Sequence, residues 1–91
     1  MSLIRCFDVS NGLRNSEVLV TVQDANGRKH AIRVERDFLS TIRGTEYLPI
    51  GVVHVDPNTK NSLVEFSHEP ETGLNRIWVK PDQFEPAEAA A

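Results

Sequence analysis

The stretch EVLVTVQDANGRKHAIRV, residues 17–34, constrains the fold of this chain more than any other feature. In each half of it, the residues of one face recur at every second position, which is the period of a strand with one buried side. These faces consist of Val18, Val20 and Val22 in the first half and of His30, Ile32 and Val34 in the second. Asn26-Gly27 lies between them and favours a tight turn, because both residues tolerate positive φ. The pattern predicts an antiparallel β-hairpin.

Three further short apolar stretches follow between residues 50 and 79. The first is expected to begin near Ile50, because Pro49 cannot donate a hydrogen bond to a sheet. The others are SLVEF at 62–66 and RIWV at 76–79, separated by polar, turn-rich segments. The predicted core contains the alternate valines in 18–22 and in 53–55, together with Val64, Phe66, Ile77 and Val79.

The segment ERDFLSTIRG, residues 35–44, breaks the alternation. Val34, Phe38 and Ile42 are spaced four apart, which favours one or two turns of amphipathic helix ended by Gly44. The alternative is an irregular loop that places Phe38 and Leu39 in the core. Residues 3–7 are expected to add an edge strand, and residues 80–84 a single 3₁₀ turn.

These elements predict a mainly β fold, namely a small five- or six-stranded barrel with at most one short helix. The chain has 91 residues, enough for one small domain. We expect that domain to span residues 1–86, with residues 87–91, AEAAA, as a frayed tail. No apolar stretch is long enough to cross a bilayer, and the N-terminus is unlike a signal peptide.

The order of hairpin, connector, three-strand meander and 3₁₀-like turn resembles the Src-homology-3-like small barrels. The residues that carry the resemblance are GVVHVD at 51–56, SLVEF at 62–66 and NRIWVKPDQFEP at 75–86. A glycine followed by alternating valines is also similar to the KOW-like variant of these barrels. The resemblance implies an SH3-like barrel, and its KOW-like variant implies association with RNA or the ribosome.

The formal net charge of −3 is unevenly distributed. Residues 28–43 hold five basic and two acidic residues, whereas residues 44–91 hold three basic and eight acidic ones. The overall acidity argues against a dedicated duplex-DNA binder, because phosphate neutralisation supplies much of the affinity for DNA. An RNA site would use Lys29, Arg33 and Arg36. The alternative is a solvated strand edge whose cations prevent aggregation.

Trp78, the only tryptophan, stands between two inward-facing residues of its strand. Strict alternation places Trp78 and Arg76 on the outer face, with Glu65 and His54 on the neighbouring strands. An exposed indole among charged groups is typical of a protein-binding anchor. In the alternative interpretation, the indole is packed under a loop or terminus of the same chain.

The sequence contains no pattern typical of an enzyme. His30, His54, His68 and Cys6 lack the short spacings of metal-ligand sets. No serine or cysteine stands in a nucleophile motif, and no glycine-rich run precedes a helix. We therefore expect no catalytic residue, metal or cofactor. The single cysteine cannot form an intramolecular disulfide, which favours a cytoplasmic location.

The leading hypothesis is a non-catalytic protein-interaction or assembly module with an unknown protein partner, using Trp78 and the loop 68–75. Self-association falls within this hypothesis. The alternatives are a KOW-like RNA- or ribosome-associated barrel and an accessory subunit of a larger enzyme.

Overall fold

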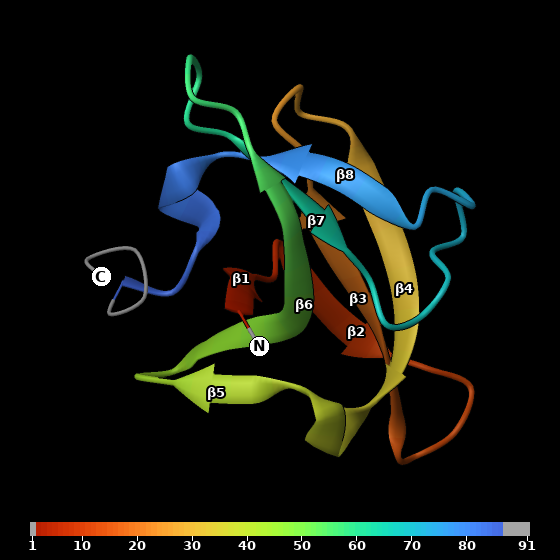
Figure 1. Ribbon diagram of the computed structural model, residues 1–91. Coiled ribbons are helices and arrows are strands. Elements are labelled where there is room, and N and C mark those ends of the chain that lie inside the picture. Colours follow the sequence, from red (N-terminus) through yellow and green to blue (C-terminus); the bar gives the residue numbers. More distant parts are fainter. Residues whose placement is uncertain (1, 87–91) are drawn as a thin grey trace.

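The predicted hairpin forms β3 (Glu17–Gln23) and β4 (Lys29–Glu35) in the computed structural model, which describes residues 2–86 (Figure 1). The two strands pair in register over their full length, and the valines of β3 are buried at every second position. In the connecting turn, Asp24 Oδ1 accepts the backbone N–H groups of Asn26 and Arg28, both at 2.9 Å. Gly27 adopts φ +85°, which explains the glycine at this point of the turn.

The remaining strands complete two antiparallel sheets. One has the order β1-β6-β7-β8, with β5 also paired to β6, and the other has the order β2-β3-β4. The further elements are β1 (Ser2–Arg5), β2 (Asp8–Asn11), η1 (Arg36–Phe38), β5 (Ser40–Ile42), β6 (Thr45–Val55), β7 (Ser62–Glu65), β8 (Arg76–Val79) and η2 (Pro81–Gln83).

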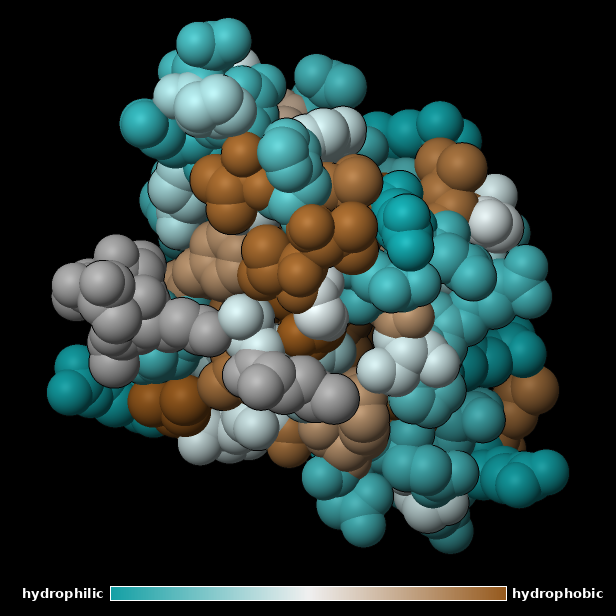
Figure 2. All heavy atoms as spheres, viewed as in Figure 1, coloured by the Kyte–Doolittle hydropathy of each residue, from teal (hydrophilic) through white to brown (hydrophobic). Residues whose placement is uncertain are grey.

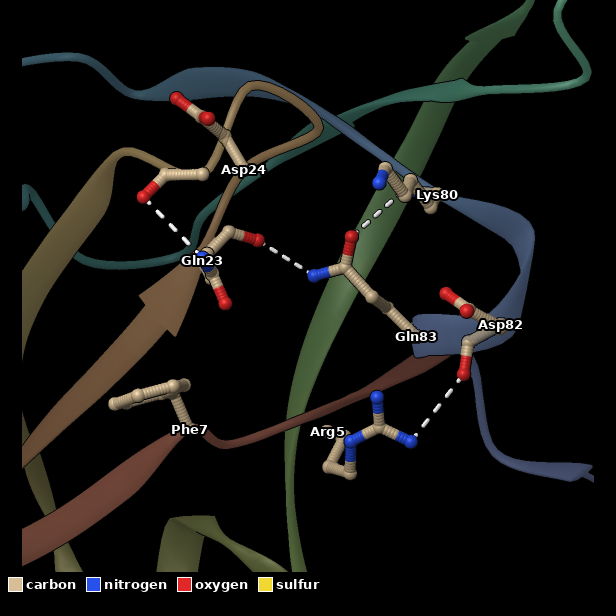
Figure 3. Close-up of a pocket in the computed structure, with 8 residues that line it drawn as sticks. Arg5, Phe7, Gln23, Asp24, Lys80, Asp82 and Gln83 are labelled. Carbon is tan, nitrogen blue, oxygen red and sulfur yellow. Dashed lines mark hydrogen bonds between the residues drawn. The ribbon is translucent and has the colours of Figure 1, made fainter.

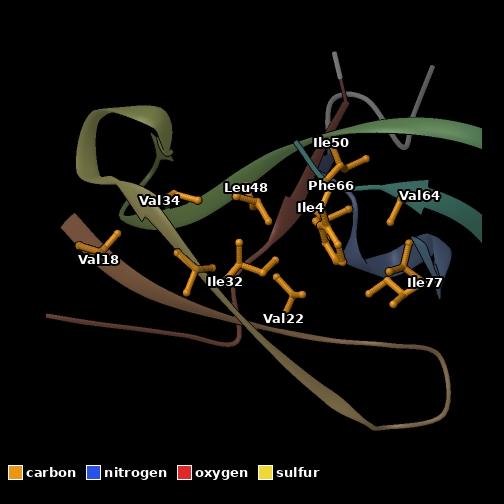
Figure 4. Packing of buried hydrophobic residues seen from close by; sticks show 12 residues of the cluster. Ile4, Val18, Val22, Ile32, Val34, Leu48, Ile50, Val64, Phe66 and Ile77 are labelled. Carbon is orange, nitrogen blue, oxygen red and sulfur yellow. The ribbon is translucent and has the colours of Figure 1, made fainter. Parts of the chain in front are cut away.

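The core lies between the two sheets (Figure 4). Val18, Val22 and Ile32 point inward from the β2-β3-β4 sheet and meet side chains such as Leu48 and Val64 from the other sheet. Most of these side chains are fully inaccessible. The predicted core positions at 18–22, 64, 66, 77 and 79 are confirmed, and Ile4, Leu48 and Ile50 join them.

The mainly β class is confirmed, but the described residues contain eight strands rather than five or six, and the sheets are not closed into a barrel. A hydrogen bond of 2.7 Å from Ala25 N in the β3–β4 turn to Trp78 O in β8 links the two sheets, whereas Phe7 N donates to Thr21 O beside the β2–β3 ladder. Between β4 and β8, the N–H of Glu71 in the 66–75 loop donates a hydrogen bond to the carbonyl oxygen of Ala31. That loop therefore lies along β4, where a closing strand would pair.

The segment 35–44 does not form the predicted amphipathic helix. A single 3₁₀ turn, η1, is followed by a β5–β6 hairpin whose two turn residues, Arg43 and Gly44, have φ of 53° and 81°. Positive φ at both central residues is the geometry of a tight hairpin turn. Gly44 is thus a turn residue and not a helix stop, whereas Phe38 and Leu39 do pack against the core as the loop alternative required.

β6 begins at Thr45, before Pro49, and not near Ile50 as predicted. Cys6 N donates to Glu46 O at 3.0 Å, so the Cys6–Glu46 pair, which follows directly on the β1–β6 ladder, is hydrogen-bonded. Hydrogen-bonded and non-bonded pairs alternate in an antiparallel ladder. Pro49 opposite Leu3 falls on a non-bonded pair, where the missing N–H of proline costs nothing.

A β-bulge in β6 breaks the strict alternation that would place Val52 and Val55 on opposite faces. The register with β7 shifts between Val52 and His54, so Val53 is an extra residue. Val52 and Val55 then line the same surface hollow, and all three valines are 43–48% exposed. Val53 and Val55 are therefore not part of the core.

Among the described residues, the buried apolar side chains form a single cluster. The prediction of a frayed tail at 87–91 lies outside the described part of the chain. Over residues 2–86, no helix combines the length and the apolar character that a bilayer crossing requires.

Candidate functional site

The outer face of β6, β7 and β8 carries the exposed tryptophan. The register places His54 opposite Leu63 and Leu63 opposite Trp78, so these side chains form one row across three strands. Trp78 is 39% exposed, and its ring meets that of His54 edge to face, with centroids 6.2 Å apart. The backbone beneath is fixed, because Trp78 O accepts the N–H of Ala25. The indole is half-covered by its strand neighbours and keeps an open surface.

An ion pair borders this row. Arg76 lies opposite Glu65, and Nη2 of the arginine is 3.6 Å from Oε1 of the glutamate. Both side chains are about half exposed, so the pair contributes little to stability. The structure thus brings together the four predicted residues, His54, Glu65, Arg76 and Trp78. Leu63 completes the surface; it was missed, although its place two residues before Glu65 on β7 could have revealed it.

The loop 66–75 is anchored by a buried histidine. His30 is fully inaccessible, with Nε2 2.9 Å from Asp24 Oδ2 and Nδ1 2.9 Å from Thr72 Oγ1. The carboxylate can only accept, so Nε2 carries a proton. Nδ1 then accepts the Thr72 hydroxyl when the ring is neutral and donates to it when the ring is charged. Either way, one side chain joins the β3–β4 turn to this loop.

The Asp24 carboxylate, the His30 imidazole and the Thr72 hydroxyl are hydrogen-bonded in the same order as the acid, base and nucleophile of a catalytic triad. A catalytic base must also reach the leaving group, and His30 has no accessible surface. The arrangement therefore acts as an anchor. Two contacts support this role along the loop: Glu71 N donates to Ala31 O at 2.8 Å, and His68 packs edge to face on Phe38 at 4.9 Å.

Asp24 has a pKa below its usual range. Burial raises the pKa, but the hydrogen bonds from the His30 side chain and from the backbone N–H groups of Arg28 and Asn26 outweigh it. The carboxylate therefore stays ionised well into the acidic range. Its two oxygens already accept hydrogen bonds from Asn26, Arg28 and His30.

The three basic residues of the RNA hypothesis each contact a different group. Lys29 and Arg33 share the outer face of β4, as predicted, but Arg36 lies in η1. Lys29 Nζ lies 4.3 Å from the centroid of the Phe7 ring, Arg33 pairs with Glu71 at 3.6 Å, and Arg36 donates to an asparagine side chain. Each cation already has its own partner.

A polar hollow of about 220 Å³ lies where β1, β3 and η2 meet (Figure 3). Gln83 bridges its upper wall, because Nε2 donates to Gln23 O and Oε1 accepts the N–H of Lys80. Arg5 donates to Asp82 O at 3.4 Å, and the exposed Phe7 also lines the hollow. Two cations and two carboxylates line the hollow, so it has no net preference for an anion. It acts as the junction that ties η2 to β3.

Two observations within residues 2–86 concern metal ligands and the single thiol. This part of the chain contains no cluster of three or more histidine, cysteine or acidic side chains that could hold a metal ion. Burial, and to a lesser degree the nearby Glu46, raises the pKa of the Cys6 thiol to about 12. The thiol is therefore protonated at neutral pH and a poor nucleophile.

Comparisons with models of protein families, with curated proteins and with solved structures each found no significant match.

Proposed function

We propose that this protein is a non-catalytic protein-interaction module whose binding surface is the outer face of β6, β7 and β8. The observation that carries the proposal is the half-exposed Trp78, in a row with Leu63 and His54. A large indole on a rigid sheet face combines a wide apolar contact with little loss of side-chain freedom on binding. Arg76 and Glu65 supply a polar rim beside it.

The architecture supports such a role. The two sheets fix the backbone of all three strands, and the anchored 66–75 loop adjoins the end of β8 at Arg76. Binding would therefore require little ordering of the chain, which favours affinity. A second copy of the chain is one partner that this surface can accept.

The test compares proteins captured from cell extract by the parent domain and by two variants. Trp78→Ala removes the anchor, and Leu13→Ala truncates an 82% exposed side chain in the turn between β2 and β3. We expect a partner to be retained by the parent and by Leu13→Ala and lost with Trp78→Ala, since central aromatic anchors contribute about 2 kcal/mol or more.

Folding of the Trp78 variant must be checked beside capture. Because the indole is only half covered, we expect Trp78→Ala to lower the free energy of unfolding by roughly 1–2 kcal/mol. A partner that binds the folded Trp78 variant as well as the parent would refute the proposed surface.

A further inference from the structure

Among residues 2–86, no strand pairs with one edge of β6 beyond Ile50. β1 pairs with β6 only from Tyr47 to Ile50, whereas β7 pairs with the other edge from Gly51 to Val55. Within residues 2–86, no strand covers the remaining edge of this second half. Backbone groups at Leu48 and Ile50 point to β1, so by the two-residue alternation those of Val52 point to the open edge. Unpaired backbone groups of this kind are a template for another strand.

An apolar hollow of about 240 Å³ lies beside this edge, between the end of β6 and η2. The residues that line it are Ser2, Val52, Val55, Lys60, Ser62, Pro81 and Phe84. Figure 2 shows apolar side chains gathered over this end of β6, below the projecting turn that follows it. The hollow is on the opposite side of the β6–β7 pair from Trp78, because Val55 pairs with Ser62 and His54 with Leu63.

Of the described residues that line the hollow, Lys60 is the only charged one. It adopts φ 66° in the β6–β7 turn, where its N–H donates to Asp56 O at 2.8 Å. No ion pair to its side chain occurs within the described part of the chain. The carboxylate of Asp56 instead accepts the N–H of Asn58 at 2.8 Å. Among the described residues, the rim of this apolar hollow therefore presents one cation without a counter-ion.

We propose that this edge and hollow bind an extended acidic peptide segment of a partner protein as an added β-strand. The peptide would run antiparallel to β6, in line with β1, and hydrogen-bond to the open edge near Val52. One apolar side chain enters the hollow between Val55 and Phe84. A carboxylate of the peptide pairs with Lys60, which selects acidic over basic segments. This site is separate from the Trp78 surface and does not depend on it.

The probe is a short synthetic peptide of alternating valine and glutamate, titrated into isotope-labelled protein and followed by amide chemical shifts. We expect shifts at Val52–Val55, Lys60 and Phe84. The same peptide with lysine in place of glutamate should bind more weakly. Lys60→Glu should reduce affinity for the glutamate peptide roughly threefold to tenfold, the scale of one exposed ion pair turned into a like-charge contact. It should also raise affinity for the lysine peptide.

Matched variants separate this site from others. Val55→Lys places a charge at the 48% exposed valine of the edge and should abolish binding, whereas Leu74→Lys, at a 43% exposed leucine in the loop, should not. Trp78→Ala should leave peptide affinity unchanged. The proposal fails if both peptides bind equally, if the shifts map to the Trp78 row, or if none appear at millimolar peptide. It also fails if sedimentation shows a dimer that Val55→Lys dissociates, since a second copy would then occupy the edge.

Discussion

His30→Ala is the substitution that best tests how this fold is held together. His30 is the only buried ring that hydrogen-bonds at both nitrogens, joining Asp24 in the β3–β4 turn to Thr72 in the 66–75 loop, among the residues described. Alanine removes both bonds and leaves a cavity between these segments.

The cost follows from the contacts. A hydrogen bond to a charged group contributes about 1.5–3 kcal/mol, and one to a hydroxyl about 1 kcal/mol. Asp24 keeps its two backbone donors and is 14% exposed, so the first value belongs at the low end of its range. With about 1–2 kcal/mol for the cavity, His30→Ala should lower the free energy of unfolding by roughly 3–5 kcal/mol. A domain of this length has only about 5–14 kcal/mol in total.

Urea unfolding followed by far-ultraviolet circular dichroism measures this loss. Thr72→Val is the matched variant, because it removes one bond and keeps the side-chain shape; we expect a cost of about 1 kcal/mol. The two losses should not add, since both include the His30–Thr72 bond. Hydrogen exchange should show the Glu71 amide, bonded to Ala31 O, opening faster in both variants. A His30→Ala domain within 1 kcal/mol of the parent, with Glu71 equally protected, would refute the anchor.

Four further outcomes are expected. The pKa of Asp24 is lower in the folded than in the unfolded state, so its stabilising effect is complete above the unfolded pKa of about 4 and is lost as pH falls through the folded pKa. The free energy of unfolding, measured over acidic pH, should therefore fall with decreasing pH, and Asp24→Asn should remove this dependence. Cys6, with a pKa of about 12, should react slowly with iodoacetamide until urea unfolds the chain. Phe66→Ala should cost about 3–5 kcal/mol in urea unfolding, because the ring is 7% exposed. Gly44→Ala, at φ +81°, should cost about 1 kcal/mol in thermal unfolding, while Gly51→Ala, in open space, should not.

Elements with strict alternation could be predicted from the sequence. The β3–β4 hairpin and β8 follow a two-residue period with buried valines and isoleucines, and one face of each is apolar enough to fix the register. The same rule placed Trp78 and Arg76 outward, beside Glu65. This part of the candidate site was therefore predictable, because side chains of paired strands share a face.

What the sequence could not reveal depends on local backbone detail. The spacing of Phe38 and Ile42 is compatible with either a short helix or a loop. The structure has a tight hairpin turn here, with positive φ at Arg43 and Gly44. One extra residue, Val53, placed Val52 on the same face of β6 as Val55, against the strict alternation. His30 was placed correctly on the inner face of β4, but its partner Thr72 is 42 residues away and follows no local pattern.

The position of β1 sets the order in which this protein can fold as it is synthesised. β3 and β4 are neighbours along the chain and can pair as soon as both have left the ribosome. β1 is made first, yet its partner is the middle of β6, and its Ile4 also bridges Phe84 near the end of the described chain. β1 therefore stays unpaired until Tyr47–Ile50 of β6 have emerged, and its apolar residues are exposed to chaperones throughout that interval.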